Sequence, residues 1–197
     1  MSVSEALLDR AAAAVREGDL VVYPTETVYG LGADALNAAA VKRVFDAKNR
    51  DRSKPVSLAV PSVSAAANVT KPTDREQAFM REFLPGPVTV VVERGPAVPD
   101  ILTAGSDRVG VRVPDHEVAL ALLERTPPLT ATSANVSGRE SAQTVDTLDA
   151  EIRGAAQTIV DAGETAGGRG STVVDVAAGT VHRRGPLADA VERWLQQ

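Results

Sequence analysis

A short run of cationic side chains is the first feature of this chain that could do chemistry. From Lys48 to Lys54 the sequence carries four positive charges and one negative charge, although the whole chain has a formal net charge of -5. Such a local excess of cations can bind an anionic ligand, for example a nucleotide phosphate. The alternative is a solvated loop after a helix, because cations are also favoured near a helix C-terminus. Charge alone favours the loop.

Small polar side chains gather at the ends of two predicted strands. Thr25 and Thr27 follow a buried strand in the segment 23–32, where hydroxyls and free amides can hold a small polar ligand. Ser133 and Asn135 are two residues apart, so an extended backbone turns both to one side, where they could contact phosphate oxygens or surround a metal-bound triphosphate. For both segments the alternative is an ordinary polar turn.

A further candidate is Arg112, which interrupts an otherwise apolar strand. A buried guanidinium is costly unless it is paired, so Arg112 should meet a carboxylate, either of a ligand or of a buried Asp or Glu. The glycine-rich stretch 162–170 is predicted to be a flexible loop. It is followed by no Gly-Lys-Ser/Thr sequence, so it does not match a phosphate-binding P-loop.

The composition excludes several kinds of site. The chain has no cysteine, which excludes disulfides, thiolate catalysis and cysteine-based zinc sites, and its two histidines argue against a histidine-rich metal cage. Aromatic residues make up 3%, which argues against a base-stacking platform, and the acidic balance argues against a broad basic tract for nucleic acid. No apolar run reaches the roughly 18 residues of a membrane span, and the N-terminus has no signal pattern. We therefore expect a soluble, cytoplasmic protein without a protein-bound metal.

The order of the predicted elements indicates one α/β domain over residues 1–197. Helices and strands alternate early and strands dominate late, which favours an open, mixed sheet with flanking helices over a purely parallel sheet. Helices are predicted over 4–17, 37–47, 73–83, 114–123 and 188–195. Strands are predicted over 20–23, 56–60, 88–92, 109–113, 129–132, 158–160, 171–176 and 180–183.

Five motifs, taken together and in order, resemble one family. They are Tyr-Pro-Thr-Glu-Thr-Val-Tyr-Gly-Leu from Tyr23, Lys-Asn-Arg from Lys48, Pro-Gly-Pro-Val-Thr from Pro85, Val-Arg-Val-Pro from Val111 and Thr-Ser-Ala-Asn from Thr132. The combination is similar to the threonylcarbamoyl-adenylate synthases of the YrdC-like family, from about Leu20 to Pro186. Because longer relatives carry a second, C-terminal domain, the chain is expected to be the short, single-domain form.

The resemblance implies a twisted α/β sheet around a large cationic cavity. It also implies an enzyme that joins L-threonine, bicarbonate and ATP into L-threonylcarbamoyladenylate and releases pyrophosphate. This chemistry needs positioning and charge stabilisation but no covalent nucleophile, so the lack of cysteine does not count against it. Mg²⁺ is expected to accompany ATP. The product would serve threonylcarbamoyladenosine modification of tRNA, which separate transfer proteins complete, and a weak contact with tRNA is a further expectation.

The resemblance also implies roles for single residues. Lys48 and Arg50 are expected to be catalytic and to contact the nucleotide. The other ATP-binding positions are Lys54, Ser133, Asn135, Ser141 and Arg183. The threonine-binding positions are Thr25, Thr27, Arg112, Thr132 and Ser171. Asp51 and Arg52 are expected to face solvent. Some relatives have a histidine shortly after the Lys-Pro segment. Residues 56–60, which stand there in this chain, include no histidine, so the contact that it makes should be absent or replaced.

Two other functions stay open at this point. One is a related carbamoyl-transfer domain that acts on another acceptor. The other is a non-catalytic RNA-binding module, in which the cationic cavity would serve an RNA backbone. Salt-sensitive RNA binding without ATP turnover would favour the module. The intact Lys-x-Arg and Ser-x-Asn pairs argue against a paralogue that has lost its activity.

Overall fold

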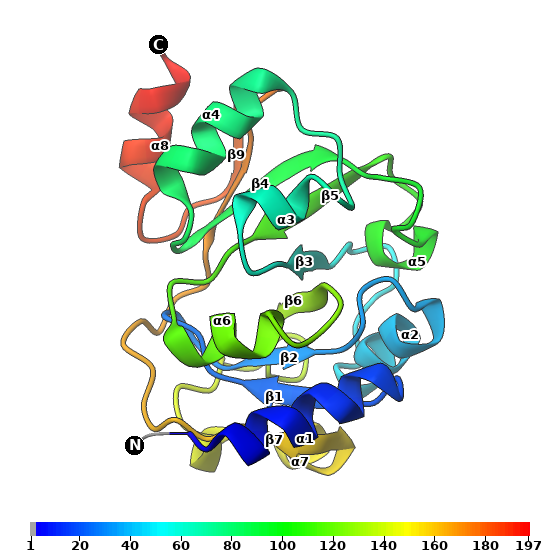
Figure 1. The fold of residues 1–197 in the computed structure, drawn as a ribbon. Coiled ribbons are helices and arrows are strands. Elements are labelled where there is room, and N and C mark those ends of the chain that lie inside the picture. Colours follow the sequence, from blue (N-terminus) through cyan, green and yellow to red (C-terminus); the bar gives the residue numbers. More distant parts are fainter. Residues whose placement is uncertain (1–2) are drawn as a thin grey trace.

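The computed structural model describes residues 3–197, so Met1 and Ser2 of the predicted domain lie outside the described residues. Within this range the strands form one open, mixed sheet in the order β7-β1-β2-β6-β3-β5-β4-β8-β9 (Figure 1). The strands are β1 (Leu20–Tyr23), β2 (Gly30–Gly32), β3 (Ser57–Ala59), β4 (Val88–Glu93), β5 (Arg108–Arg112), β6 (Leu129–Ser133), β7 (Ala156–Ile159), β8 (Thr172–Asp175) and β9 (Thr180–Arg183). Three neighbouring pairs are parallel, namely β1 with β7, β3 with β5 and β4 with β8. The predicted α/β class and mixed sheet are confirmed.

Helices flank this sheet, and those predicted from capping residues begin where the caps are. The helices are α1 (Glu5–Arg16), α2 (Ala38–Ala47), α3 (Val63–Ala66), α4 (Asp74–Phe83), α5 (Asp100–Thr103), α6 (Glu117–Leu123), the 3-10 turn η1 (Val145–Thr147), α7 (Ala150–Ala155) and α8 (Ala188–Leu195). The Asn37 side chain accepts from the amide of Ala39 at 3.0 Å, which starts α2. The Thr73 amide donates to Glu76 Oε2 at 2.7 Å, which completes the predicted capping box of α4.

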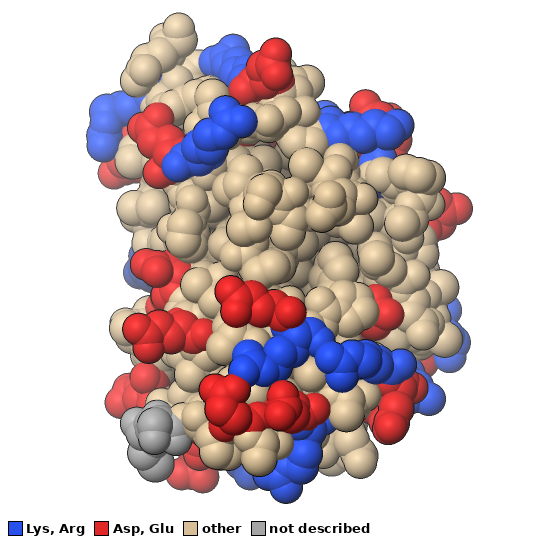
Figure 2. Space-filling model, in the orientation of Figure 1, with Lys and Arg blue, Asp and Glu red and all other residues tan. Residues whose placement is uncertain are grey.

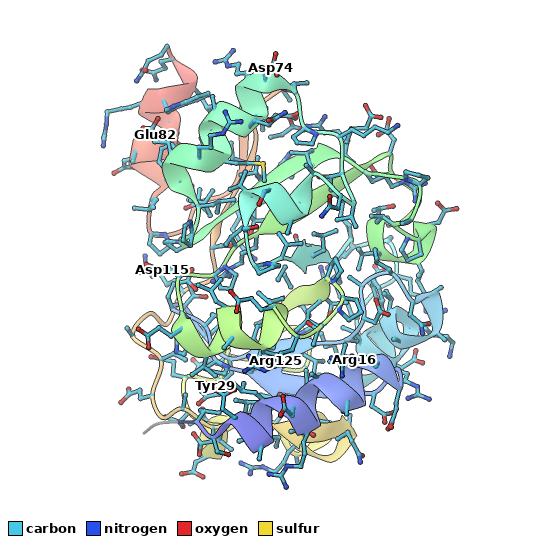
Figure 3. All side chains as sticks on the ribbon, in the orientation of Figure 1. Arg16, Tyr29, Asp74, Glu82, Asp115 and Arg125 are labelled. Atoms are coloured by element: carbon cyan, nitrogen blue, oxygen red, sulfur yellow. The ribbon has the colours of Figure 1, made fainter. Side chains whose placement is uncertain are left out.

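Apolar side chains hold the helices against the sheet. One buried cluster lies under α1 and α6, and a larger one lies around β3, β4, β5 and α4. At the end of the sheet that carries β8 and β9, Phe79 of α4 stacks on Phe83 at 4.5 Å and meets the ring of Trp194 edge-on at 4.9 Å. The Trp194 indole also donates to Glu82, labelled on α4 in Figure 3, at 2.8 Å. These contacts fix α8 on α4.

Some elements differ from the predictions. No strand was predicted at residues 30–32, but Gly30, Leu31 and Gly32 form β2, and the Tyr23 ring occupies the space that side chains at Gly30 and Gly32 would need. The helix predicted from residue 114 begins only at Glu117, after an extended N-cap residue, His116. Strand β7 begins two residues earlier than predicted, directly after α7. The short helices α3, α5 and α7 were not predicted, since each is too brief to show a clear periodicity.

The face of the molecule seen in Figure 2 has a largely uncharged centre with charged side chains above and below it. Over α1 and α6 the charges alternate in sign: Arg125, labelled in Figure 3, pairs with Glu5, and its Nε atom lies 3.4 Å from Asp9 Oδ1. Such exposed pairs contribute little to stability. Among residues 3–197, no helix combines the length and the apolar character that crossing a membrane requires.

Candidate active site

A pocket of about 520 Å³ lies against the central strands. Its wall is formed by side chains of β3, β4, β5, β6 and β8 and by the segment that follows β1. Four arginines line it, namely Arg50, Arg108, Arg112 and Arg183, and the described lining residues include no Asp or Glu. A concave wall with this charge attracts anions.

The alternation of strand β5 explains two of these arginines. Arg108, Gly110 and Arg112 are two residues apart, so all three face the pocket from the same side of the sheet. A side chain at Gly110 would place its Cβ 2.3 Å from Ser57 Oγ, so only glycine fits between the two arginines. The sequence analysis missed Arg108, although the period of two from Arg112 could have identified it.

Two of the predicted threonine-binding residues, Thr25 and Thr27, contact Arg112. Its Nη2 atom donates to Thr27 Oγ1 at 2.7 Å and lies 3.5 Å from Thr25 Oγ1. The same nitrogen lies 3.0 Å from Glu26 Oε2, so the arginine meets a buried carboxylate of the chain, one of the two alternatives left open above. Thr25, Thr132 and Arg112 line the pocket, whereas Thr27 is buried beside it.

Ser171 and Arg183 form a second group in the wall of the same pocket. Arg183 Nε donates to the Ser171 carbonyl at 2.9 Å, and its Nη2 donates to the Ser171 hydroxyl at 3.0 Å. The hydroxyl also contacts Thr89 Oγ1 at 2.7 Å. Burial, and then the nearby charges of Arg112 and Arg50, lowers the pKa of Arg183. A predicted ATP-binding residue and a predicted threonine-binding residue therefore lie in direct contact.

The cationic run divides into buried and exposed parts. Arg50 lines the pocket and donates from Nε to the Lys54 carbonyl at 3.1 Å and from Nη2 to the Pro55 carbonyl at 2.9 Å. Burial lowers the pKa of its guanidinium. Lys54 is exposed and is not among the lining residues, and Asp51 and Arg52 are exposed as predicted.

Lys48, which was expected to contact the nucleotide, is buried beside the pocket and does not line it. Its side chain is buried, with 2% of the residue exposed, and it is not among the pocket-lining residues. Its Nζ atom donates to the carbonyl of Ser133 and, at 2.6 Å, to the carbonyl of Asn135. Burial, and then the charge of Arg50, lowers its pKa to about 8. Lys48 thus connects the end of α2 to the Ser-x-Asn segment.

The Ser-x-Asn segment contributes to the pocket through its serine. Ser133 and Ser141 line the pocket, whereas Asn135 is buried. Asn135 Nδ2 donates to the carbonyls of Val136 and Arg139, both at 2.9 Å, and within residues 3–197 its Oδ1 atom has no hydrogen-bond partner. Among the same residues, no group of three or more His, Asp or Glu side chains could hold a metal ion.

The glycine-rich stretch lies against the first motif. Gly168 N donates to the Thr27 carbonyl at 2.8 Å, and Thr165 Oγ1 donates to the same oxygen at 3.3 Å. A Cβ at Gly167 would lie 2.6 Å from Thr27 Cα, so the glycine permits this close approach. The stretch has no regular secondary structure, and its predicted flexibility stays a prediction.

Comparison with known proteins identifies relatives that match this chain over most of its length. A family model named Sua5_yciO_yrdC and described as "Telomere recombination" matches residues 13–185. The threonylcarbamoyl-AMP synthase of Pyrococcus abyssi is 42% identical over 84% of this chain and 49% of its own length. That of Bacillus subtilis is 38% identical over 90% of this chain and 52% of its own length. The chain therefore spans about half the length of these two relatives.

A solved structure agrees with the sequence match. The crystal structure of Pyrococcus abyssi Sua5 complexed with L-threonine is similar to this chain with a TM-score of 0.92 at 38% identity. The similarity covers 98% of this chain and 58% of the other. The resemblance that the five motifs indicated is thus confirmed over nearly all of the residues. The chain belongs to the Sua5, YciO and YrdC family.

Proposed function

We propose that this chain is a threonylcarbamoyl-AMP synthase, a nucleotidyltransferase acting as a single YrdC-like domain. It would join L-threonine, bicarbonate and ATP into L-threonylcarbamoyladenylate and release pyrophosphate. The observation that carries the proposal is the arginine-lined pocket, whose wall holds Arg50, Arg183, Ser133 and Arg112 together. Membership of a family that includes threonylcarbamoyl-AMP synthases supports the same conclusion.

L-Threonine binds at the Arg112 end of the pocket in this proposal. Arg112 is the group for the substrate carboxylate, because a guanidinium can bind a carboxylate through two parallel hydrogen bonds. The Thr25 hydroxyl lies 3.5 Å from this guanidinium, and Thr132 lines the same pocket. Buried Thr27 accepts a hydrogen bond from the guanidinium at 2.7 Å and so fixes its orientation. Ser171, held by Arg183, completes the predicted threonine-binding set. The threonine complex of the Pyrococcus abyssi relative supports an amino-acid subsite in this fold.

ATP occupies the Arg50 end. Arg50 and Arg183 offset phosphate charge, since their guanidinium groups contact carbonyls or Ser171 and no carboxylate within the described residues. Ser133 and Ser141 supply hydroxyls, and exposed Lys54 acts from outside the pocket lining. Lys48 and Asn135 serve the nucleotide indirectly, because the Lys48 ammonium fixes the backbone of the Ser-x-Asn segment.

The reaction then follows from proximity. The threonine amine and bicarbonate give a carbamate and release water, and a carbamate oxygen attacks the α-phosphorus of ATP. The bond between the α-phosphorus and the bridging oxygen breaks, and pyrophosphate leaves with the electron pair. The chain contributes orientation and positive charge, which is where such sites gain most of their rate.

Mg²⁺ would accompany the triphosphate. Since the described pocket lining offers hydroxyls and carbonyls but no carboxylate, the ion would be held mainly by phosphate and water oxygens, as is common for Mg²⁺. When bound, it would neutralise charge on the departing pyrophosphate. The product would pass to separate proteins that complete threonylcarbamoyladenosine in tRNA.

Incubation with ATP, Mg²⁺, L-threonine and labelled bicarbonate tests the proposal. We expect label in an adenylate whose formation requires threonine and releases pyrophosphate, and a lower yield when serine replaces threonine. Transfer of labelled carbamoyl to another acceptor would instead indicate the related carbamoyl-transfer activity. A folded chain that binds RNA in a salt-sensitive way but forms no labelled adenylate would contradict an enzymatic function.

A further inference from the structure

The four arginines of the pocket differ in their charge partners. Arg108 Nη2 lies 2.8 Å from Glu76 Oε1 and 3.0 Å from Asp175 Oδ1. Arg112 Nη2 lies 3.0 Å from Glu26 Oε2. By contrast, Arg50 and Arg183 form no salt bridge with any described carboxylate. The pocket therefore has two charge-compensated arginines and two whose charge is available to a ligand.

Glu26 lies behind Arg112 as seen from the pocket. It is not among the lining residues, and both of its carboxylate oxygens are buried. Neither oxygen accepts an aligned hydrogen bond from a residue in the described range, although one is within ion-pair distance of Arg112. The contact between the two side chains is therefore chiefly electrostatic. A ligand in the pocket meets Arg112 but not Glu26.

We propose that Glu26 is a specificity-determining residue that acts through Arg112 by cancelling the net charge of this subsite, so that the subsite accepts the carboxylate of an amino acid and rejects a phosphate dianion. The inference rests on the proposed function for the identity of the amino acid. The choice between a carboxylate and a phosphate dianion does not depend on the proposed function. Glu26 thus assigns the ends of one cationic pocket to different substrates.

Simple electrostatics gives the direction of this effect. The electrostatic attraction between a subsite and an anion grows with the product of their charges. A buried negative charge behind Arg112 therefore lowers the binding energy of a dianion twice as much as that of a monoanion. An amino-acid zwitterion still forms directional hydrogen bonds to the guanidinium through its carboxylate. Its ammonium group supplies a positive charge of its own. Phosphates are left to Arg50 and Arg183, which form no salt bridge with a carboxylate of residues 3–197 and instead contact carbonyls or Ser171. Rejecting the wrong ligand in this way is a general route to specificity.

Glu26→Gln tests the proposal, because it removes the charge and nearly preserves the shape. Inorganic phosphate and acetate are titrated separately into the folded protein by NMR at pH 7.5 and constant ionic strength. We expect the phosphate Kd to fall by roughly tenfold and the acetate Kd by roughly threefold, as estimated for one charge about 6 Å from the anion at an effective dielectric constant of about 80. Glu26→Asp, which keeps the charge, should retain the wild-type preference. If Glu26→Gln does not fold, Glu26→Ala takes its place.

The matched control is Glu93→Gln, which removes an exposed glutamate that lies 3.2 Å from Lys71. It should leave both dissociation constants unchanged. Arg112→Gln combined with Glu26→Gln should abolish the gain in phosphate binding, because the effect acts through Arg112. An unchanged phosphate-to-acetate preference in Glu26→Gln overturns the proposal, as does a gain that persists in the double variant or appears equally in Glu93→Gln.

A threonine titration separates this inference from the proposed function. In Glu26→Gln, phosphate should compete with L-threonine at lower concentrations than in the wild type. A wild-type protein that binds no L-threonine would contradict the proposed substrate. The phosphate and acetate titrations would still decide whether Glu26 selects the charge of the anion at Arg112.

Discussion

At the scale of single residues, burial decides which cations can meet a ligand. The sequence places Lys48 and Arg50 two residues apart with the same charge, but the structure gives their side chains different surroundings. Arg50 lines the pocket, whereas the Lys48 ammonium donates hydrogen bonds to two backbone carbonyls. Composition and spacing could predict that this run is functional. They could not separate a ligand-facing cation from one that orders the chain, because that depends on where the Ser-x-Asn segment lies in space.

The buried Lys48 ammonium should make stability depend on pH. Its pKa of about 8 lies below the ordinary value of 10.5, so between these values the unfolded chain binds more protons and stability rises with pH. From pH 7 to pH 9.5 we expect the wild type to gain on the order of 2 kcal/mol relative to Lys48→Met. Urea unfolding of both proteins at the two pH values measures this difference.

The control for this experiment is Lys42→Met, which removes an exposed lysine on the same helix. Since this variant keeps Lys48, its stability should follow the wild type across the two pH values. A difference between wild type and Lys48→Met that does not change with pH would show that the buried amine does not titrate in this window.

At the scale of elements, capped helices and β-branched strands could be predicted from the sequence, whereas the structural roles of the glycines could not. Helix α4 begins at the capping box of Thr73 and Glu76 as predicted, since the bonds that start it are local. Strand β2 has a glycine at each end, and the ring of Tyr23 occupies the space that a side chain at either position would need. Local propensity carries no information on such a contact. Gly110 is a similar case, because its neighbour Ser57 is distant in the sequence.

Gly110→Ala should therefore damage both the fold and the pocket. The new Cβ would lie 2.3 Å from Ser57 Oγ and 2.9 Å from Thr89 Cγ2, so these side chains or the strands that carry them must move. We expect a loss of about 1–3 kcal/mol in the free energy of unfolding, as for other overpacked sites, and weaker threonine binding. Chemical denaturation and a threonine titration measure the two effects.

Gly154→Ala provides the comparison, because within residues 3–197 a Cβ at this position in α7 would meet no heavy atom within 4 Å beyond its chain neighbours and the backbone of its own helix. Alanine is the better helix former, so this change should leave stability unchanged or raise it by up to about 1 kcal/mol. If Gly110→Ala were as stable as Gly154→Ala, the floor of the pocket would have room for a side chain.

At the scale of the whole molecule, the pocket collects motifs that are far apart in the sequence. Arg50, Ser133 and Arg183 lie in three separate segments and line one pocket. The sequence indicated their common purpose only through resemblance to a family, because no local pattern reports on the order of strands in a sheet. The strand order itself, with β7 beside β1 and β6 between β2 and β3, had no signal in the periodicity.

Ligand binding should stabilise the whole chain. A ligand that binds only the folded state at about 100 times its Kd contributes about 2.7 kcal/mol, which for a chain of this size is a rise of roughly 5–10 °C in Tm. We expect ATP with Mg²⁺ to produce a shift of this order and Arg50→Ala to lose most of it. Thermal unfolding followed by circular dichroism, with and without ATP, measures the shift.

Arg52→Ala is the matched control, because Arg52 is exposed and pairs with Asp46 at 3.0 Å rather than lining the pocket. It should keep the full ATP-dependent shift. A full shift in Arg50→Ala would mean that the nucleotide is bound elsewhere on the molecule.

Strand β6 links the two halves of the sheet along its own length. Its residues 129–131 pair with β3, and its residues 132–133 pair with β2. Neither half can therefore complete its hydrogen bonding while the other is unfolded, and a slip of β6 by one residue would break the register on both sides at once. Although its core consists of several clusters, the chain should unfold in a single cooperative transition, and a cut within β6 should prevent either fragment from folding alone.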